Sequence, residues 1–153
     1  MNVLSKETKD FIGKDKTVKS FNDKWNSDSG TAYPFDCPPV DIPMGGGFVP
    51  GRIYEFYGPE SGFKTGMSLT GAALFAKYCE ANKINYTVCW IESESTLDKA
   101  RAFSFGVPPD RLVLFETDVF EEGRDKIRYW LAMAKKKGMR LFIVWDTIAA
   151  TST

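Results

Sequence analysis

The chain has 153 residues, of which 43% are hydrophobic and 26% charged, values that are ordinary for one soluble globular domain with a single core. Its 20 basic and 20 acidic residues cancel, so no net field identifies a nucleic-acid partner, although this balance is compatible with a local basic face. Three scattered cysteines, no histidine and no long apolar segment argue against a disulfide framework, a zinc site and a membrane partner, and they predict a cytoplasmic protein.

The first third of the chain is predicted to be a polar arm followed by an irregular loop. Residues 1–36 are weakly periodic, with a short helix predicted over 5–11 and a linker over 26–33. Clustered prolines and glycines predict an irregular loop over 37–51. We therefore predict an N-terminal arm and linker over 1–36 and a core domain over 37–153.

The next stretch has the pattern of a strand, a glycine-bounded loop and a helix. Alternating aromatic and aliphatic residues predict a strand over 52–57, and apolar residues at helical spacing predict a helix over 64–82. The loop brings Lys64 and Thr65 to the helix start, where backbone N–H groups, an ammonium and a hydroxyl can bind a phosphate and its magnesium ion. The alternative is a strand-to-helix turn in which this lysine and threonine are incidental. Phe63 stands where the usual phosphate-loop pattern has its second glycine.

The remaining residues alternate between predicted strands and predicted helices. The strand candidates are short apolar runs rich in β-branched side chains, as expected for strands buried on both faces. They cover 86–91, 112–115 and 140–146. Helices are predicted over 97–105 and 119–137, the second ending on lysines before a glycine. This alternation predicts an α/β fold with a mostly parallel sheet flanked by helices.

The loop sequence resembles the phosphate loop of RecA-family recombinases, which reads GPESSGKT in bacterial proteins. In phage recombinases of the UvsX type phenylalanine can precede the lysine, so Phe63 favours a phage-like relative, which would act in the cytoplasm of a bacterial host. The similarity covers about residues 40–150 and implies a RecA-like P-loop NTPase that binds ATP and Mg²⁺. The loop residues implied to bind the nucleotide are Gly58, Pro59, Glu60, Ser61, Gly62, Phe63, Lys64 and Thr65.

Two acidic strand ends extend the resemblance. Asp146 ends the strand predicted over 140–146 at the family spacing from Lys64, and it is implied to hold Mg²⁺ together with Thr65, through a water molecule. Trp145 departs from the small or aliphatic residue that usually precedes this acid, and we interpret it as a buried sheet residue.

Residues 90–98 resemble the family segment FIDAEHALD, in which the second acid orients and deprotonates the attacking water. This catalytic role falls on Glu94. The alternative is that Glu92 and Glu94 are solvent-facing acids near a helix N-terminus. A tyrosine that packs on adenine in bacterial relatives is replaced by Arg101, whose guanidinium can stack on a purine.

For the complete protein, the resemblance implies ATP-dependent binding of single-stranded DNA and strand exchange in recombination and repair, carried out by a homo-oligomeric filament. The N-terminal arm is then expected to contact a neighbouring subunit, although a disordered tail explains its composition equally well. Two further interpretations stay open: another RecA-fold ATPase, such as a replicative helicase or a clock-type ATPase, and a non-catalytic nucleotide-binding fragment.

The resemblance also predicts a core truncated after the strand that carries Asp146, the Walker B strand. In the family a further strand, two DNA-binding loops and a glutamine that senses the γ-phosphate follow this point. That further strand lies between the Walker B strand and the strand predicted over 52–57, so both are expected to have unpaired backbone groups. Hydrolysis by this chain is expected to be weak or absent unless the missing half is supplied separately.

Overall fold

The computed structural model describes residues 32–95 and 97–152. The helix predicted over 5–11 and most of the predicted arm lie outside these ranges. The described part contains one sheet of three parallel strands in the order β2-β1-β3, which confirms the predicted α/β fold with a parallel sheet. The strands are β1 (Tyr86–Glu92), β2 (Leu112–Glu116) and β3 (Arg140–Asp146).

The central strand, β1, is buried on both faces. Its residues from Val88 to Ile91 are each at most 1% exposed, as the apolar, β-branched sequence predicts. The register pairs Glu92 with Glu116 of β2 and with Asp146 of β3. Because the strands are parallel, these three carboxylates lie at the same edge of the sheet, where ligands of α/β proteins usually bind.

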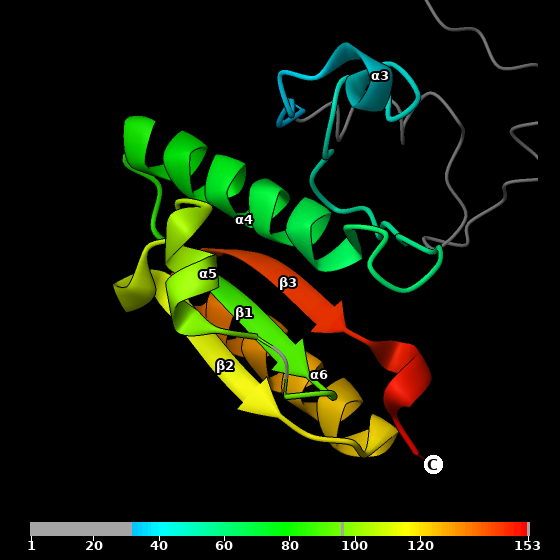
Figure 1. Cartoon of the computed structure of the whole chain (residues 1–153). Helices are drawn as coiled ribbons and strands as arrows, with labels where there is room; N and C mark the ends of the chain where they lie inside the picture. The colour runs from blue at the N-terminus through cyan, green and yellow to red at the C-terminus, as the bar shows by residue number, and fades with distance from the viewer. Residues whose placement is uncertain (1–31, 96, 153) are drawn as a thin grey trace, which may run out of the picture.

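Two long helices, α4 (Lys64–Ala81) and α6 (Phe120–Lys137), cover opposite faces of the sheet, as Figure 1 shows. Small residues let α4 lie close to the strands: Ala72 and Ala76 are at most 1% exposed. On the other face, the Trp145 ring stacks on Phe120 with a centroid distance of 5.3 Å and fills the space that a side chain at Gly123 would occupy. Trp145 is therefore a half-buried sheet residue accommodated by a glycine of α6.

The prediction of a strand over residues 52–57 is wrong for the described structure. No residue of this segment is assigned to a strand, and Ile53 and Tyr57 are 100% and 89% exposed. The predicted alternation survives in part, because Tyr54 and Phe56 are half-buried with ring centroids 4.9 and 6.1 Å from that of Phe48. A strand needs a hydrogen-bonded neighbour, and none of the three described strands pairs with this segment.

Residues 32–51 contact α4 through Tyr33 and Phe48, whose rings lie against residues of that helix. Tyr33, predicted at the end of the linker, exchanges two backbone hydrogen bonds with Phe48, and both side chains are buried. The Arg140 guanidinium donates to the Tyr33 hydroxyl over 3.0 Å. The predicted irregular loop is interrupted by one helical turn, α3 (Pro38–Asp41), whose prolines occupy the first positions of the helix, where they are tolerated.

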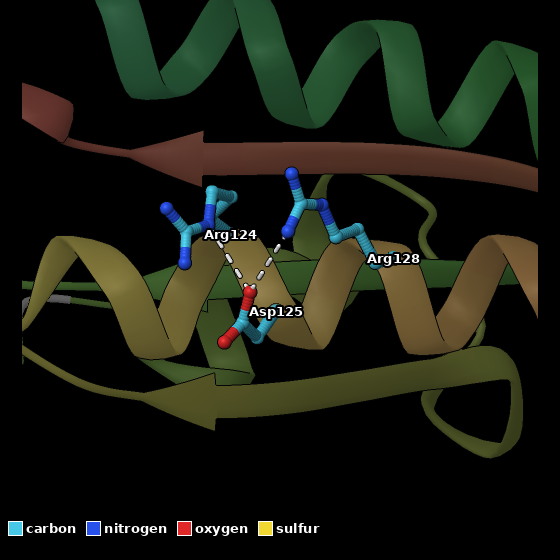
Figure 2. A network of polar contacts seen from close by, with 3 residues as sticks. All are labelled: Arg124, Asp125 and Arg128. Carbon is cyan, nitrogen blue, oxygen red and sulfur yellow. Dashed lines mark hydrogen bonds and ion pairs between the residues drawn. The ribbon is translucent and has the colours of Figure 1, made fainter.

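The remaining described elements are one short helix and two single turns. Helix α5 (Lys99–Ser104) is capped by the Asp98 carboxylate, which accepts from the Ala100 N–H, and the single turns η1 (Pro109–Arg111) and η2 (Ile148–Ala150) complete the set. Figure 2 shows the outer face of α6, where the Asp125 carboxylate accepts from Arg124 over 3.1 Å and from Arg128 over 3.4 Å. Among the described helices, none combines the length and apolar character that crossing a membrane requires.

Candidate nucleotide-binding site

The predicted phosphate loop connects residues 52–57 to the first turn of α4. Gly58 has a φ of 155°, and Ser61 and Phe63 have φ values of 59° and 65° in the left-handed region. The Gly62 N–H donates to the Pro59 carbonyl over 3.1 Å, and a Cβ at Gly62 would lie 2.9 Å from that oxygen. The glycine that the loop retains is therefore required by a close backbone approach.

The side chain of Lys64 folds back over this loop. Its ammonium donates to the Gly58 carbonyl over 3.1 Å and to the Pro59 carbonyl over 2.8 Å. These bonds hold the cation at the start of α4, where backbone N–H groups have no intrahelical partner and attract anions. A phosphate that enters the loop can accept a bond from the same ammonium in place of one of these carbonyls.

Thr65 and Asp146 are 81 residues apart in the sequence and in direct contact in the fold. The Thr65 hydroxyl donates to Asp146 Oδ2 over 2.7 Å. Helix α4 positions the hydroxyl in its first turn, and β3 positions the carboxylate at its last residue. The two residues predicted to hold a magnesium ion are thus brought together.

The donor set at this contact fits a magnesium ion supplied with a nucleotide. A hydroxyl and a carboxylate are hard oxygen ligands, and Mg²⁺ usually binds one or two protein oxygens, several waters and substrate phosphates. In the described ranges no three His, Cys, Asp or Glu residues are grouped to hold a metal by themselves. The remaining ligands would therefore have to come from phosphate and water.

Glu92, the last residue of β1, and Glu94, two residues further on, differ sharply in their surroundings. Glu92 is 2% exposed, and its carboxylate accepts from the Trp90 indole N–H over 3.1 Å and from the Glu94 backbone N–H over 3.4 Å. Glu94 is exposed, as an acid that contacts water and substrate must be. The Ser93 N–H donates to the Asp146 carbonyl over 3.0 Å, which ties this turn to the end of β3.

The sequence analysis assigned the catalytic role to Glu94 alone, but it did not predict that Glu92 is buried while Glu94 is exposed. Its alternative interpretation treated Glu92 and Glu94 as equivalent surface acids, and for Glu92 it is wrong. A carboxylate at the end of a fully buried strand, two residues after a tryptophan, has no water and needs protein donors. That position could have been read as buried from the continuous apolar run before it.

Arg101 is exposed on α5. The contact with the phosphate loop is made by Phe105, the residue that follows α5. The Phe63 and Phe105 rings lie with their centroids 6.1 Å apart. A side chain at Gly66, buried in the first turn of α4, would overlap the Phe63 ring. The sequence analysis named neither Gly66 nor a role for Phe105. The signal it missed was a glycine three residues after Phe63, one helical turn away.

Comparison with known proteins shows the family of this chain. The family described as RecA N-terminal domain matches residues 3–153. The chain belongs to the RecA family. It is 38% identical over 120 residues to Protein RecA of Acholeplasma laidlawii strain PG-8A, an alignment that covers 78% of this chain and 33% of that protein.

Two other relatives give similar values. Protein RecA of Levilactobacillus brevis is 37% identical over 121 residues, covering 78% of this chain and 30% of that protein. Protein RecA of Mesomycoplasma hyopneumoniae strain 7448 is 35% identical over 112 residues, covering 72% and 30%. The chain thus spans about a third of the length of the curated RecA relatives it matches. The phage-like, UvsX-type subtype stays a prediction.

Proposed function

We propose that this chain is the ATP-binding part of a RecA-like recombination and repair protein. The loop residues from Gly58 to Thr65 would bind the phosphates of ATP, and Arg101 would contact the base. The observation that carries the proposal is the 2.7 Å bond between Thr65 and Asp146, because it brings a phosphate-loop hydroxyl and a strand-end carboxylate into one metal-binding arrangement.

Each site residue then has a role that its surroundings support. Lys64 neutralises phosphate charge, since its ammonium already lies over the loop. Thr65 and Asp146 hold Mg²⁺, which when bound would withdraw charge from the phosphate oxygens. Glu94 would orient and deprotonate the attacking water, and the bond from its backbone to the buried Glu92 holds it at the sheet edge.

We propose, from membership of the RecA family, that the complete protein acts on single-stranded DNA as a cytoplasmic homo-oligomeric filament. The described part of the chain carries no feature that we assign to DNA. The last turn of α6 carries Lys135, Lys136 and Lys137, which a helix C-terminus explains as well, and the nearby Arg140 of β3 donates to the Tyr33 hydroxyl. DNA-dependent hydrolysis is therefore proposed only for a longer protein.

The test of ATP binding compares two lysines of the same helix. By titration calorimetry, Lys64→Ala should remove measurable Mg·ATP binding, because the ammonium over the loop is lost. Lys77→Ala is the matched control, since Lys77 is an exposed residue of α4 outside the loop, and it should bind like the unaltered chain. Equal affinity in the two variants, or no binding by the unaltered chain, would contradict the proposal.

Hydrolysis is tested separately from binding. In a longer protein that carries the rest of a RecA core, Glu94→Gln should keep nucleotide affinity and lower turnover by roughly 100-fold or more, the range for a positioned acid–base group. The measurement is phosphate release at saturating Mg·ATP. Unchanged turnover would return Glu94 to the status of a surface acid.

A further inference from the structure

Two residues at the start of α4 are of types that their backbone positions disfavour. Phe63 has a φ of 65°, in the left-handed region where glycine is the usual residue and a side chain is disfavoured. Gly66 lies in the first turn of the helix without a left-handed φ, where glycine is less favourable than any residue except proline. Neither residue is explained by its own backbone position.

A single contact accounts for both exceptions. A Cβ built on Gly66 would overlap the Phe63 ring, with Cδ2 of that ring 2.6 Å away, far inside normal van der Waals contact. The ring therefore lies directly on the backbone of the first helical turn. Phe63 can occupy its position in this way only if residue 66 has no side chain, so the two residues form one unit.

The same ring extends the contact to α5. Phe63 is 53% exposed, and its other neighbour is Phe105, which follows the last residue of α5 and is half-buried against the core. The next residue, Gly106, lies next to α4, where a Cβ at this position would be in ordinary van der Waals contact with that of Ala73, at 3.8 Å. The backbone of Phe63 thus belongs to the phosphate loop, while its ring contacts α4 at Gly66 and the end of α5 at Phe105.

We propose that Phe63, Gly66 and Phe105 form an aromatic clasp that holds the phosphate loop against α4 and α5, and that Phe63 is a positioning residue for nucleotide binding. This inference rests on the proposed function, because it deepens the account of the same site. The clasp sets the loop, which would bind phosphates, at a defined position relative to α5, which carries Arg101.

The clasp should matter most for a ligand that contacts both elements. A nucleoside triphosphate can contact the loop through its phosphates and α5 through its base, so fixing the two elements together lowers the ordering cost of binding. Inorganic triphosphate contacts only the loop and gains less from this arrangement. Comparing the affinities of the two ligands therefore distinguishes a positioning role of the clasp from a general effect on folding.

The first experiment is a double-mutant cycle measured by titration with Mg·ATP. Gly66→Ala should weaken binding roughly tenfold, because the ring must leave its place. Phe63→Gly should cost less, because glycine suits the left-handed φ. The double variant should bind like Phe63→Gly alone, since a methyl group at 66 is harmful only when the ring is present. Additive losses would overturn the proposal.

A second glycine of α4 provides the matched control. A Cβ at Gly71 would overlap the Phe48 ring in the aromatic cluster, at a distance from the loop. Gly71→Ala should therefore destabilise the chain, and Phe63→Gly should give no rescue. Rescue of both glycine variants to the same extent would show a general loosening of the fold and would also overturn the proposal.

The second experiment leaves the loop sequence intact. Phe105→Leu removes the ring contact with Phe63 and keeps an apolar side chain packed against the core. We expect Mg·ATP affinity to fall about two- to tenfold, the contribution of an aromatic pair, and inorganic triphosphate affinity to change less than about twofold. Equal changes for the two ligands would contradict positioning between loop and α5.

The design distinguishes the clasp from the proposed function. If the unaltered chain does not bind Mg·ATP, the proposed function fails. The double-mutant cycle of Phe63→Gly and Gly66→Ala is then measured as free energies of unfolding in urea, without ligand. Non-additive unfolding energies for Phe63→Gly and Gly66→Ala would still support the clasp, and additive ones would overturn it. If the chain binds and only the cycle is additive, the clasp alone fails.

Discussion

Strand β1 and residues 52–57 both lead into the candidate site, but their surroundings are opposite. β1 is hydrogen-bonded on both sides and ends at the buried Glu92. Residues 52–57 lead into Gly58 and pair with none of the described strands, and Ile53 is fully exposed. The Thr65–Asp146 side of the site is thus built on a packed sheet, whereas the entry to the phosphate loop depends on Tyr54 and Phe56 against Phe48. Local stability should follow the same division.

The largest expected difference is between an apolar side chain of β1 and one of residues 52–57. Trp90→Ala should lower the free energy of unfolding by about 3–5 kcal/mol, because it empties a fully buried site. Ile53→Ala should change it by less than about 0.5 kcal/mol. Urea denaturation monitored by circular dichroism measures both. Similar losses would mean that residues 52–57 are packed in solution and would break the comparison.

The second prediction asks whether a neighbouring strand removes the difference. In a longer chain that carries the region following the matched part of RecA relatives, Ile53→Ala should cost about 2–4 kcal/mol, the range for a buried aliphatic side chain. Backbone amides of residues 52–57 should become protected from hydrogen exchange at the same time. If both remain as in the present chain, these residues do not become a sheet strand.

The third prediction uses the buried thiol of β1. Burial raises the pKa of Cys89 from 9.0 to about 12. Below pH 9 both states keep the proton; above it the unfolded thiol ionises while the folded one does not, so stability falls as pH rises from 9 toward 12. Between pH 8 and 10 this contributes a loss of about 1 kcal/mol, which Cys89→Ala should remove.

The exposed Cys37 provides the control for this pH effect. Cys37→Ala should show the same alkaline loss of stability as the unaltered chain, because this substitution at an exposed position leaves the buried Cys89 unchanged. Urea unfolding at several pH values gives the slopes. A Cys89→Ala variant with an unchanged slope would show that other groups cause the alkaline loss, such as Cys79 and Tyr33, whose pKa values burial also raises.

The smallest effect is expected on the outer face of α6. Asp125 contacts two arginines there, but the side chains of Asp125 and Arg128 are 61% and 71% exposed, so solvent screens the charges (Figure 2). Asp125→Ala should change the free energy of unfolding by less than about 0.5 kcal/mol, and less still in 1 M salt. A salt-independent loss above 1 kcal/mol would indicate a role in packing rather than charge.

The parts of the fold that sequence could predict are those that local patterns determine. The three apolar runs became β1, β2 and β3, and the helices over 64–82 and 119–137 ended within a residue of the prediction. Gly138 terminates α6 in the left-handed conformation, with its N–H bonded to the Ala134 carbonyl, as the glycine after three lysines indicated.

What the sequence could not predict depends on neighbours distant along the chain. Residues 52–57 have a strand pattern, but pairing is a property of two segments, and periodicity describes only one. The burial of Tyr33 has the same origin, since Phe48, 15 residues along the chain, pairs with it. In the site, the pairing of Thr65 with Asp146 was predictable through family resemblance, whereas the contact of Phe63 with Gly66 needed coordinates.

The ring of Phe63 on Gly66 also restricts the order in which such a loop can change. A chain with glycine at 63 and a side chain at 66 needs two substitutions to reach the present pair. Acquiring Gly66 first costs only helix propensity, about 1 kcal/mol. Acquiring Phe63 first places a ring against an existing Cβ and adds left-handed strain, so this intermediate is much less stable. From such a chain, the route through the double-glycine sequence is therefore the less costly one, and a side chain at position 66 is disfavoured while Phe63 remains.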